Sequence, residues 1–161
     1  MGPPGSGKTY VGHLLQERLG LTFIEGEAEL LREYGSTENF IRHKAEALRR
    51  YFDRLRSIQV RSGGVVAFES TGLSDRAQLL ALVAEAGCAL VRVEASRESS
   101  VSRVAGREPG RNFTNEGAAE FFDYWHREVA PTYEFDAVIR NETESDDDIV
   151  EQVRSLLSAW R

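Results

Sequence analysis

Hydrophobic residues occur along the chain in two alternating patterns. Short apolar runs at 21–24, 65–68, 89–93 and 137–139 indicate buried strands. Between them, apolar positions recur at helical spacing in the ranges 9–19, 28–34, 37–61, 75–86, 96–107 and 116–130, and again from Ser145 onward. Helices that alternate with strands predict an α/β fold with a mostly parallel sheet. We expect one three-layer domain over residues 1–161.

Residues 2–9 form a glycine-rich motif directly before the first predicted helix. They read Gly-Pro-Pro-Gly-Ser-Gly-Lys-Thr, which matches the phosphate-binding loop pattern G-x-x-x-x-G-K-[ST]. In such a loop, backbone N–H groups surround a polyphosphate, the lysine reaches the β- and γ-phosphates, and the threonine hydroxyl ligates Mg²⁺. We therefore predict a P-loop NTPase fold that binds ATP and Mg²⁺ through Gly2, Pro3, Pro4, Gly5, Ser6, Gly7, Lys8, Thr9 and Tyr10.

The position of this motif creates a second expectation. A phosphate-binding loop usually follows a buried strand in the middle of the sheet, yet only Met1 precedes Gly2. Losing a central strand would leave backbone groups unpaired and apolar side chains uncovered. We expect that the true start lies upstream and that Met1 is an internal methionine at the end of the missing strand. N-terminal mass spectrometry of the native protein would contradict this if the chain began at Met1.

Composition limits the classes of partner. The 161 residues are 41% hydrophobic and 29% charged, as in ordinary globular domains. A net charge of −6 makes nucleic acid an improbable general partner. Cys88 is the one cysteine, so no intrachain disulfide forms, and we expect it to be a small buried side chain. No signal peptide or membrane-crossing apolar stretch is recognised, and these features favour the cytoplasm.

Two glutamates follow the predicted strand 21–24. Glu25 and Glu27 leave the end of a strand, where open α/β sheets place their ligands. One carboxylate is suited to holding water on Mg²⁺, and the other to accepting or orienting the proton of an attacking hydroxyl. The alternative interpretation is a solvated turn.

The apolar run 65–68 also ends in an acid, Glu69. P-loop proteins bring a second carboxylate to Mg²⁺ in this way. The next residues, Ser70, Thr71 and Gly72, offer hydroxyl and backbone donors near the same point, where an acceptor molecule would bind. A purely structural partner for Glu69 is the alternative.

Arginines recur every four residues near the end of the predicted helix 96–107. Arg103, Arg107 and Arg111 lie in or beside a segment, 104–116, that Pro109 and Gly110 prevent from continuing as a helix. Cations on a closing loop stabilise the charge that develops in phosphoryl transfer, so this segment is a candidate lid with Arg107 and Arg111 as catalytic candidates. Arg103, which precedes it, is a candidate contact of the bound nucleotide. A solvated helix face is the alternative.

Further arginines line the predicted helix 37–61. Many can pair with acids three or four residues away, through the pairs Arg42–Glu46, Glu46–Arg49, Arg49–Asp53 and Asp53–Arg56. Arg42 lies nearest the catalytic end and is the candidate for binding an anionic acceptor.

The three histidines share no metal-ligand spacing. The acids Asp146, Asp147 and Asp148 suit the first turn of the last helix.

Taken together, these motifs resemble the small P-loop kinases, and the shikimate kinase and gluconate kinase group in particular. In that group an Asp-x-Asp motif stands where this chain has Glu25-Gly26-Glu27, so the resemblance implies that Glu25 assists Mg²⁺ and Glu27 orients the acceptor hydroxyl. The stretch from Gly35 to Arg42 is similar to a pattern whose arginine binds the substrate carboxylate. Asn141, with Glu142 and Thr143 after it, stands where these kinases line the adenine pocket.

The resemblance implies transfer of the γ-phosphoryl group from ATP to a hydroxyl of a small metabolite. It assigns the substrate-binding region to about 28–61 and the lid to about 104–116. Two departures make kinase a better prediction than shikimate kinase. Glu69-Ser70-Thr71-Gly72 replaces a glycine triplet, and Arg111-Asn112-Phe113-Thr114 replaces Arg-Pro-Leu-Leu.

Other functions remain open. The arginines of the long helix would suit a kinase of nucleotides or nucleic-acid ends. A regulatory or non-catalytic nucleotide-binding protein is a second alternative. A GTPase would carry Asn-Lys-x-Asp, and no asparagine here precedes a lysine.

Overall fold

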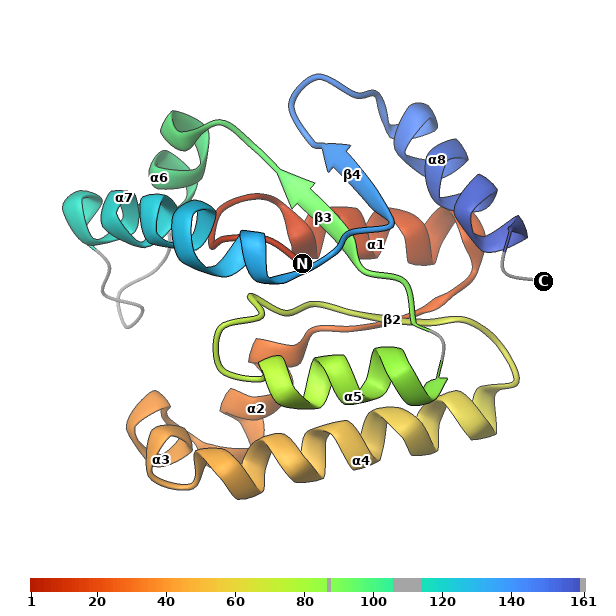
Figure 1. The fold of residues 1–161 in the computed structure, drawn as a ribbon, viewed down its shortest axis with the longest axis horizontal. Helices are drawn as coiled ribbons and strands as arrows, with labels where there is room; N and C mark the ends of the chain where they lie inside the picture. The colour runs from red at the N-terminus through yellow and green to blue at the C-terminus, as the bar shows by residue number, and fades with distance from the viewer. Residues whose placement is uncertain (87, 106–113, 160–161) are drawn as a thin grey trace.

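We describe the fold from a computed structural model of the chain, covering residues 1–86, 88–105 and 114–159 (Figure 1). Helices dominate it. The helical elements are α1 (Lys8–Leu19), α2 (Gly26–Tyr34), α3 (Thr37–Arg42), α4 (Lys44–Ser62), α5 (Arg76–Ala86), α6 (Arg97–Ala105), α7 (Asn115–Tyr124), the π-helical turn η1 (Trp125–Val129), the 3₁₀ turn η2 (Ala130–Thr132) and α8 (Asp146–Ser158).

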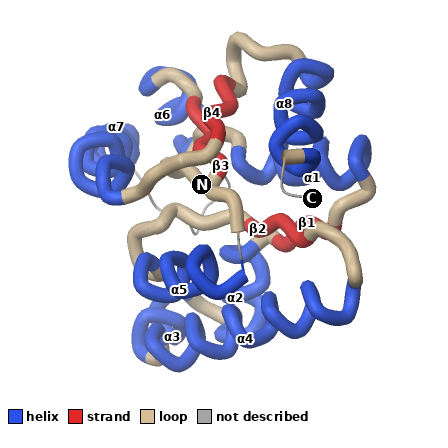
Figure 2. The backbone as a smooth tube through the Cα atoms, turned by 45° about the vertical axis from the view of Figure 1, so that its right-hand side comes forward, coloured by secondary structure: helices blue, strands red, loops and turns tan. Residues whose placement is uncertain are grey.

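Four short strands form two parallel pairs, as Figures 1 and 2 show. β1 (Thr22–Ile24) pairs with β2 (Val66–Phe68), with Phe23 opposite Ala67. β3 (Val91–Glu94) pairs with β4 (Ala137–Arg140). Parallel strands place their carboxyl ends at one edge. Within each pair, the segments after the two strands therefore leave in the same direction, and the segments after β1, β2 and β4 carry candidate site residues.

Two apolar cores lie on opposite faces of the strands, which confirms the predicted three-layer α/β arrangement. One core joins α4 and α5 to η1 and the segment after it, with Phe52, Leu79 and Trp125 almost fully buried. The other joins α1 and α8 to the strands around Ile139 and Val93. Burying an apolar side chain contributes about 1.5–3 kcal/mol, so each layer of helices is held mainly by its contact with the strands.

The structure corrects the predicted helix 37–61. It is two helices, α3 and α4, because the backbone of His43 leaves helical geometry with φ −111° and ψ 16°. The His43 backbone N–H still bonds to the carbonyl groups at the end of α3. A second difference is the π-helical turn η1 inside the segment that had been predicted as one regular helix, 116–130.

The paired charges on α4 agree with the prediction in part. Arg49 and Arg56 both pair with Asp53, at 3.6 Å and 3.4 Å. Arg42 instead pairs with Glu38, which precedes it by one turn, because the break at His43 separates it from Glu46. Glu46 pairs with Arg50 in the same helix at 2.7 Å.

The acidic run at the start of α8 has the predicted role. Asp146, Asp147 and Asp148 lie in the first turn, and Ser145 caps the helix by accepting from the Asp148 backbone N–H. Within the described parts of the chain, none of the helices is both long and apolar enough to span a bilayer.

Candidate nucleotide and phosphoryl-transfer site

The glycine-rich segment 2–7 forms a tight loop that leads into the N-terminus of α1. Gly5 and Gly7 have φ values of 81° and 93°, in the left-handed region that favours glycine. A Cβ on Gly5 would lie 2.1 Å from the Ser100 carbonyl oxygen, and one on Gly7 would lie 1.9 Å from the Asn141 side-chain nitrogen. The loop therefore needs both its backbone shape and its close approach to these neighbours. A helix N-terminus at the end of such a loop is an anion-binding site.

Two side chains from distant parts of the chain support the loop from behind. Arg103 on α6 donates to the Gly5 carbonyl at 3.2 Å, and Asn141 after β4 donates to the Ser6 carbonyl at 3.1 Å. Both residues were predicted near the nucleotide. These two hydrogen bonds use carbonyl groups of the loop, so they do not compete with an anion for the loop's backbone N–H groups.

Glu142 connects these supports. It accepts from the backbone N–H of Ser96 at 2.8 Å and lies 3.9 Å from Arg103. Hydrogen bonds from Ser99 and Ser96 lower the pKa of Glu142 below its ordinary value. The carboxylate therefore stays ionised and holds the start of α6 against the turn after β4. From the sequence, Glu142 was predicted only as a neighbour of Asn141 at the adenine pocket, because its partners Ser96 and Arg103 are about 40 positions away.

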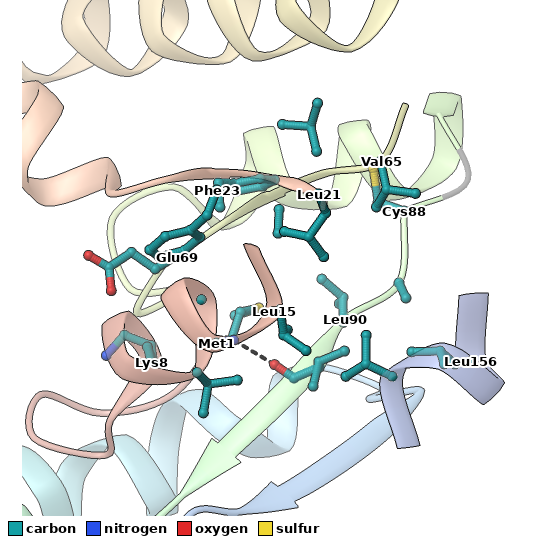
Figure 3. A pocket seen from close by; sticks show the side chains of 18 of the residues that line it. Met1, Lys8, Leu15, Leu21, Phe23, Val65, Glu69, Cys88, Leu90 and Leu156 are labelled. Carbon is teal, nitrogen blue, oxygen red and sulfur yellow. Dashed lines mark hydrogen bonds between the residues drawn. The ribbon is translucent and has the colours of Figure 1, made fainter. Parts of the chain in front are cut away.

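Lys8 and Thr9 begin α1, and each makes a different hydrogen bond. The Lys8 ammonium donates to the Pro3 carbonyl at 2.9 Å, across the loop. The Thr9 hydroxyl donates to Glu69 at 2.8 Å, and Glu69 follows the end of β2. Figure 3 shows Lys8 and Glu69, which both line the cavity drawn there, close together at one end of it. The loop and one predicted acid are thus in direct contact.

Glu25 has a different partner. Its carboxylate lies 2.9 Å from the His13 side chain, one turn beyond Thr9 on α1. The two side chains are 39% and 55% exposed, so this pair faces solvent. Glu27 lies in the first turn of α2, and the structure describes no side-chain position for it.

The turn after Glu69 is held rigidly from within. Ser70 donates to the Asp75 carboxylate at 2.7 Å and accepts from the Gly72 backbone N–H at 2.7 Å. From the other side, Trp125 donates to the Thr71 carbonyl at 2.7 Å. Ser70 is buried, and its hydroxyl is already used within the turn. The segment 70–72 therefore acts in this structure as a fixed support directly after Glu69.

Asp75 and Tyr133 complete this support, a role that the sequence predicted for neither of them. Tyr133 donates to the Gly72 carbonyl at 2.6 Å, and burial raises the pKa of its phenol to about 12. Burial also raises the pKa of Asp75, although the hydrogen bond from Ser70 acts in the opposite direction. No sequence motif indicates this role, because both residues act through tertiary contacts with the turn after Glu69.

Four further predicted residues lie away from this contact or outside the described residues. Tyr10 is 51% exposed and donates to Asp146 at 2.6 Å, which ties α1 to α8. Arg42 is exposed at the end of α3. Arg107 and Arg111 of the predicted lid lie outside the described residues.

The donor set at Thr9 and Glu69 suits Mg²⁺. This ion prefers oxygen ligands and is usually held by one or two carboxylates together with substrate phosphates. A hydroxyl and a carboxylate that meet within 2.8 Å beside a phosphate-binding loop meet that requirement. In the described parts of the chain, no cluster of three or more His, Cys, Asp or Glu side chains forms a protein-only metal site.

Comparisons with solved structures identify the same fold. The chain superimposes on shikimate kinase from Acinetobacter baumannii, in complex with shikimate, with a TM-score of 0.71 and 21% identity, covering 99% of this chain and 91% of that one. For shikimate kinase from Bacteroides thetaiotaomicron the TM-score is 0.69 and the identity 17%, with coverages of 98% and 96%.

Deoxyadenosine kinase from M. mycoides with bound dCTP is also similar, with a TM-score of 0.56, 14% identity and coverages of 99% and 97%. These likenesses establish a P-loop kinase fold. No curated protein sequence matches the chain significantly. A family profile described as AAA domain matches residues 1–132. This match covers the phosphate-binding loop and most of the fold, and the chain therefore belongs to the AAA domain family.

Proposed function

We propose that this chain is an ATP-dependent phosphotransferase that moves the γ-phosphoryl group of ATP to a hydroxyl group of a small molecule. The observation that supports this most is the 2.8 Å contact between the Thr9 hydroxyl and Glu69. It brings the metal-binding position of the loop and an acid to one point, as phosphoryl transfer requires. The likeness of the fold to solved shikimate kinases and a deoxyadenosine kinase is consistent with a phosphotransferase.

The nucleotide would be bound by the loop and the start of α1. The N–H groups of the loop and the Lys8 ammonium would contact the phosphates, and Thr9 and Glu69 would hold Mg²⁺. When bound, Mg²⁺ would neutralise charge on the β- and γ-phosphate oxygens. Lys8 can make this contact by giving up its bond to the Pro3 carbonyl, which lies within the same loop.

The acceptor would approach from the carboxyl ends of β1 and β2. Glu69 or Glu27 would accept or orient the proton of its hydroxyl, with Glu25 as an additional ligand of the hydrated metal. Arg42 would contact an anionic group of the acceptor, and Thr71 would line its site. Arg107 and Arg111 would stabilise the transferred group and exclude water, which limits hydrolysis of ATP.

A nucleoside or nucleotide as acceptor is the second candidate. The likeness to deoxyadenosine kinase supports it, with 97% of that chain covered. Nucleic-acid ends are less favoured, because the arginines of α4 that would contact a phosphate backbone are paired with acids. Arg54 pairs with Glu29 at 2.6 Å, and Arg56 with Glu85 at 3.0 Å.

A coupled assay of ADP release tests the proposal. The purified protein is given ATP and Mg²⁺ with sugar acids, polyols, shikimate, nucleosides, antibiotics or oligonucleotides, and Lys8→Ala serves as the matched control. We expect one class of small hydroxyl compound to raise ADP release at least tenfold above the rate without acceptor. Product analysis must find the phosphate on that compound. ADP release that no acceptor stimulates would contradict the proposal.

We also infer a cytoplasmic setting for this reaction. Cys88, the single cysteine, is a free, half-buried thiol, and burial raises its pKa. A thiol of this kind is unreactive and suits a reducing compartment.

A further inference from the structure

Tyr51 on α4 reaches the ends of both strands of the first pair. Its side chain is buried, with only 6% of the residue exposed. The ring packs edge-on against Phe68, with the ring centroids 6.4 Å apart and an angle of 77° between the ring planes. Phe68 ends β2, directly before Glu69. The Tyr51 ring is therefore fixed against the end of the strand that leads to Glu69.

The hydroxyl group of Tyr51 packs against the start of α2. A Cβ on Gly26 would lie 2.7 Å from the Tyr51 hydroxyl oxygen and 2.9 Å from the Glu69 carbonyl oxygen. Gly26 is buried and its φ is not positive, so the close approach rather than the backbone shape requires glycine here. Because Gly26 stands between Glu25 and Glu27, the Tyr51 hydroxyl lies where the backbone of these acids meets that of Glu69.

The strand pairing itself does not extend to this junction. The paired residues end at Ile24 and Phe68, and the last hydrogen bond runs from the Glu69 N–H to the Ile24 carbonyl at 3.3 Å. Beyond that bond, the spacing between the two segments depends on the groups that pack between them. The Tyr51 hydroxyl and Gly26 occupy that place.

The hydroxyl of Tyr51 is enclosed and makes no hydrogen bond within the part of the chain that the structure describes. Burial raises the pKa of this phenol, and the carboxylates of Asp75 and Glu69 raise it further, so the group stays a neutral hydroxyl. A buried hydroxyl without a partner carries a free-energy cost that phenylalanine, with the same ring, avoids. The hydroxyl therefore lowers stability, and its place at the junction indicates a role in the site.

We propose that Tyr51 is a positioning residue, whose hydroxyl packs against Gly26 and sets the spacing between Glu69 and the acids after β1. This inference rests on the proposed phosphotransferase function, in which Glu25, Glu27 and Glu69 act on the metal and the acceptor. Without the hydroxyl, the start of α2 moves into the vacated space, and the acids leave their working distance. A displacement of about 1 Å can lower a rate about 10²-fold.

Tyr51→Phe is the first test, because it removes the hydroxyl and keeps the ring. We expect kcat to fall about 10- to 100-fold. The KM for ATP should stay unchanged, because Tyr51 makes no contact with the phosphate-binding loop in the proposal. The melting temperature should rise by about 2–4 °C, because the unpaired hydroxyl is gone. A more stable variant with the kcat of the wild type would overturn the proposal.

Tyr133→Phe is the matched control for stability. Tyr133 is also a buried tyrosine, but its hydroxyl donates to the Gly72 carbonyl at 2.6 Å. Its removal leaves that carbonyl unpaired, so the melting temperature should fall. A fall in both variants would show that the Tyr51 hydroxyl holds a partner such as an ordered water, and would overturn its role as an unpaired spacer.

A double variant tests the contact with Gly26. In Gly26→Ala the new Cβ collides with the Tyr51 hydroxyl and with the Glu69 carbonyl, so kcat should fall. Gly26→Ala/Tyr51→Phe removes the first of these collisions, and its kcat should exceed that of Gly26→Ala. If the two single losses simply multiply in the double variant, the hydroxyl does not act through Gly26 and the proposal is overturned.

Crystal structures of the wild type and of Tyr51→Phe separate this inference from the proposed function. If no acceptor stimulates ADP release by the wild type, the proposed function fails, but the two structures still measure the spacing. We expect Gly26 to lie closer to the Glu69 carbonyl in Tyr51→Phe than in the wild type. An unchanged distance would overturn the positioning role of Tyr51, whatever the activity of either protein.

Discussion

The Thr9 hydroxyl donates a 2.8 Å hydrogen bond to the carboxylate of Glu69, 60 positions later in the chain. Thr9 is part of the phosphate-binding loop, and Glu69 follows β2 at the carboxyl edge of the strands. Glu69 leaves the carboxyl end of β2, and the first turn of α1, which carries Thr9, lies against it. The contact brings a proposed metal ligand and an acid from distant segments together beside one glycine-rich loop.

The proposed role of Glu69 predicts a large loss of activity on its replacement. Glu69→Gln keeps the size of the side chain and an acceptor for Thr9 but removes the charge that would hold Mg²⁺ or a proton. We expect kcat to fall by about 10²–10⁴-fold. The Mg²⁺ concentration that gives half of the maximal rate separates metal binding from proton acceptance. Loss of a metal ligand raises that concentration, whereas loss of a proton acceptor leaves it unchanged.

Glu25→Gln is the matched control for this measurement. Its carboxylate pairs with the solvent-facing His13 rather than with the loop. We expect a smaller loss, about tenfold or less, because Glu25 would act only through water on the metal. A larger loss for Glu25→Gln than for Glu69→Gln would reverse the assignment of the two acids.

Gly7 is predicted to tolerate no side chain. In Gly7→Ala, the new Cβ would lie 1.9 Å from the Asn141 nitrogen, in addition to the strain of a positive φ. We expect ATP affinity to fall at least tenfold, measured by isothermal titration. Gly20→Ala is the control, since Gly20 also has a positive φ, of 67°, but nothing lies within 4 Å of its Cβ position. It should cost about 1 kcal/mol of stability and leave ATP affinity unchanged.

The double variant Gly7→Ala/Asn141→Ala separates contact from strain. Removing the Asn141 side chain relieves the collision, and part of the lost ATP affinity should return. If the double variant binds ATP no better than Gly7→Ala, the close approach to Asn141 is not what makes glycine necessary.

Asp75 gives a prediction about pH. Its raised pKa means that the folded state favours the protonated acid, so its contribution to stability is fully present below the ordinary value of 3.8 and lost as pH rises through the raised value. Asp75→Asn has no charge to bury and still accepts from Ser70. Its free energy of unfolding relative to the wild type should therefore increase between pH 4 and 7, by about 1.4 kcal/mol per unit of raised pKa. Urea unfolding of both proteins at several pH values measures this difference in the free energy of unfolding.

Asp123→Asn should show the opposite sign. A hydrogen bond from Arg97 lowers the pKa of Asp123, so its stabilising contribution is present above the ordinary value and lost in acid. That variant should lose stability relative to the wild type as pH rises.

A stability difference for Asp75→Asn that stays constant or falls with pH would show that the Asp75 carboxylate carries no burial penalty.

Local patterns predicted much of the fold. The loop at 2–9, the alternation of strands and helices, and the start of the last helix at Ser145 with its acidic first turn all depend on neighbouring residues, and each is confirmed. The break between α3 and α4 was not predicted, because no proline or glycine marks it. His43 leaves the helical region where α3 meets α4, and the helical periodicity continues across that point.

Only those residues of the candidate site that belong to a recognisable sequence motif were predicted. The sequence placed Thr9 and Glu69 in the same site because each belongs to a recognisable segment. It did not reveal that Glu25 contacts His13, or that Asp75, Trp125 and Tyr133 hold the turn after Glu69. Those partners are set by how the layers pack, and no spacing in the sequence encodes them.

The central claim is that the loop at 2–9 binds a triphosphate whose end lies at Thr9 and Glu69. A crystal structure with Mg²⁺ and a non-hydrolysable ATP analogue tests it most directly. We predict the β- and γ-phosphates within hydrogen-bonding distance of the loop N–H groups and of Lys8, and Mg²⁺ bound to the Thr9 hydroxyl with Glu69 beside it. Phosphates bound elsewhere, or a metal ion that neither Thr9 nor Glu69 approaches, would contradict the account.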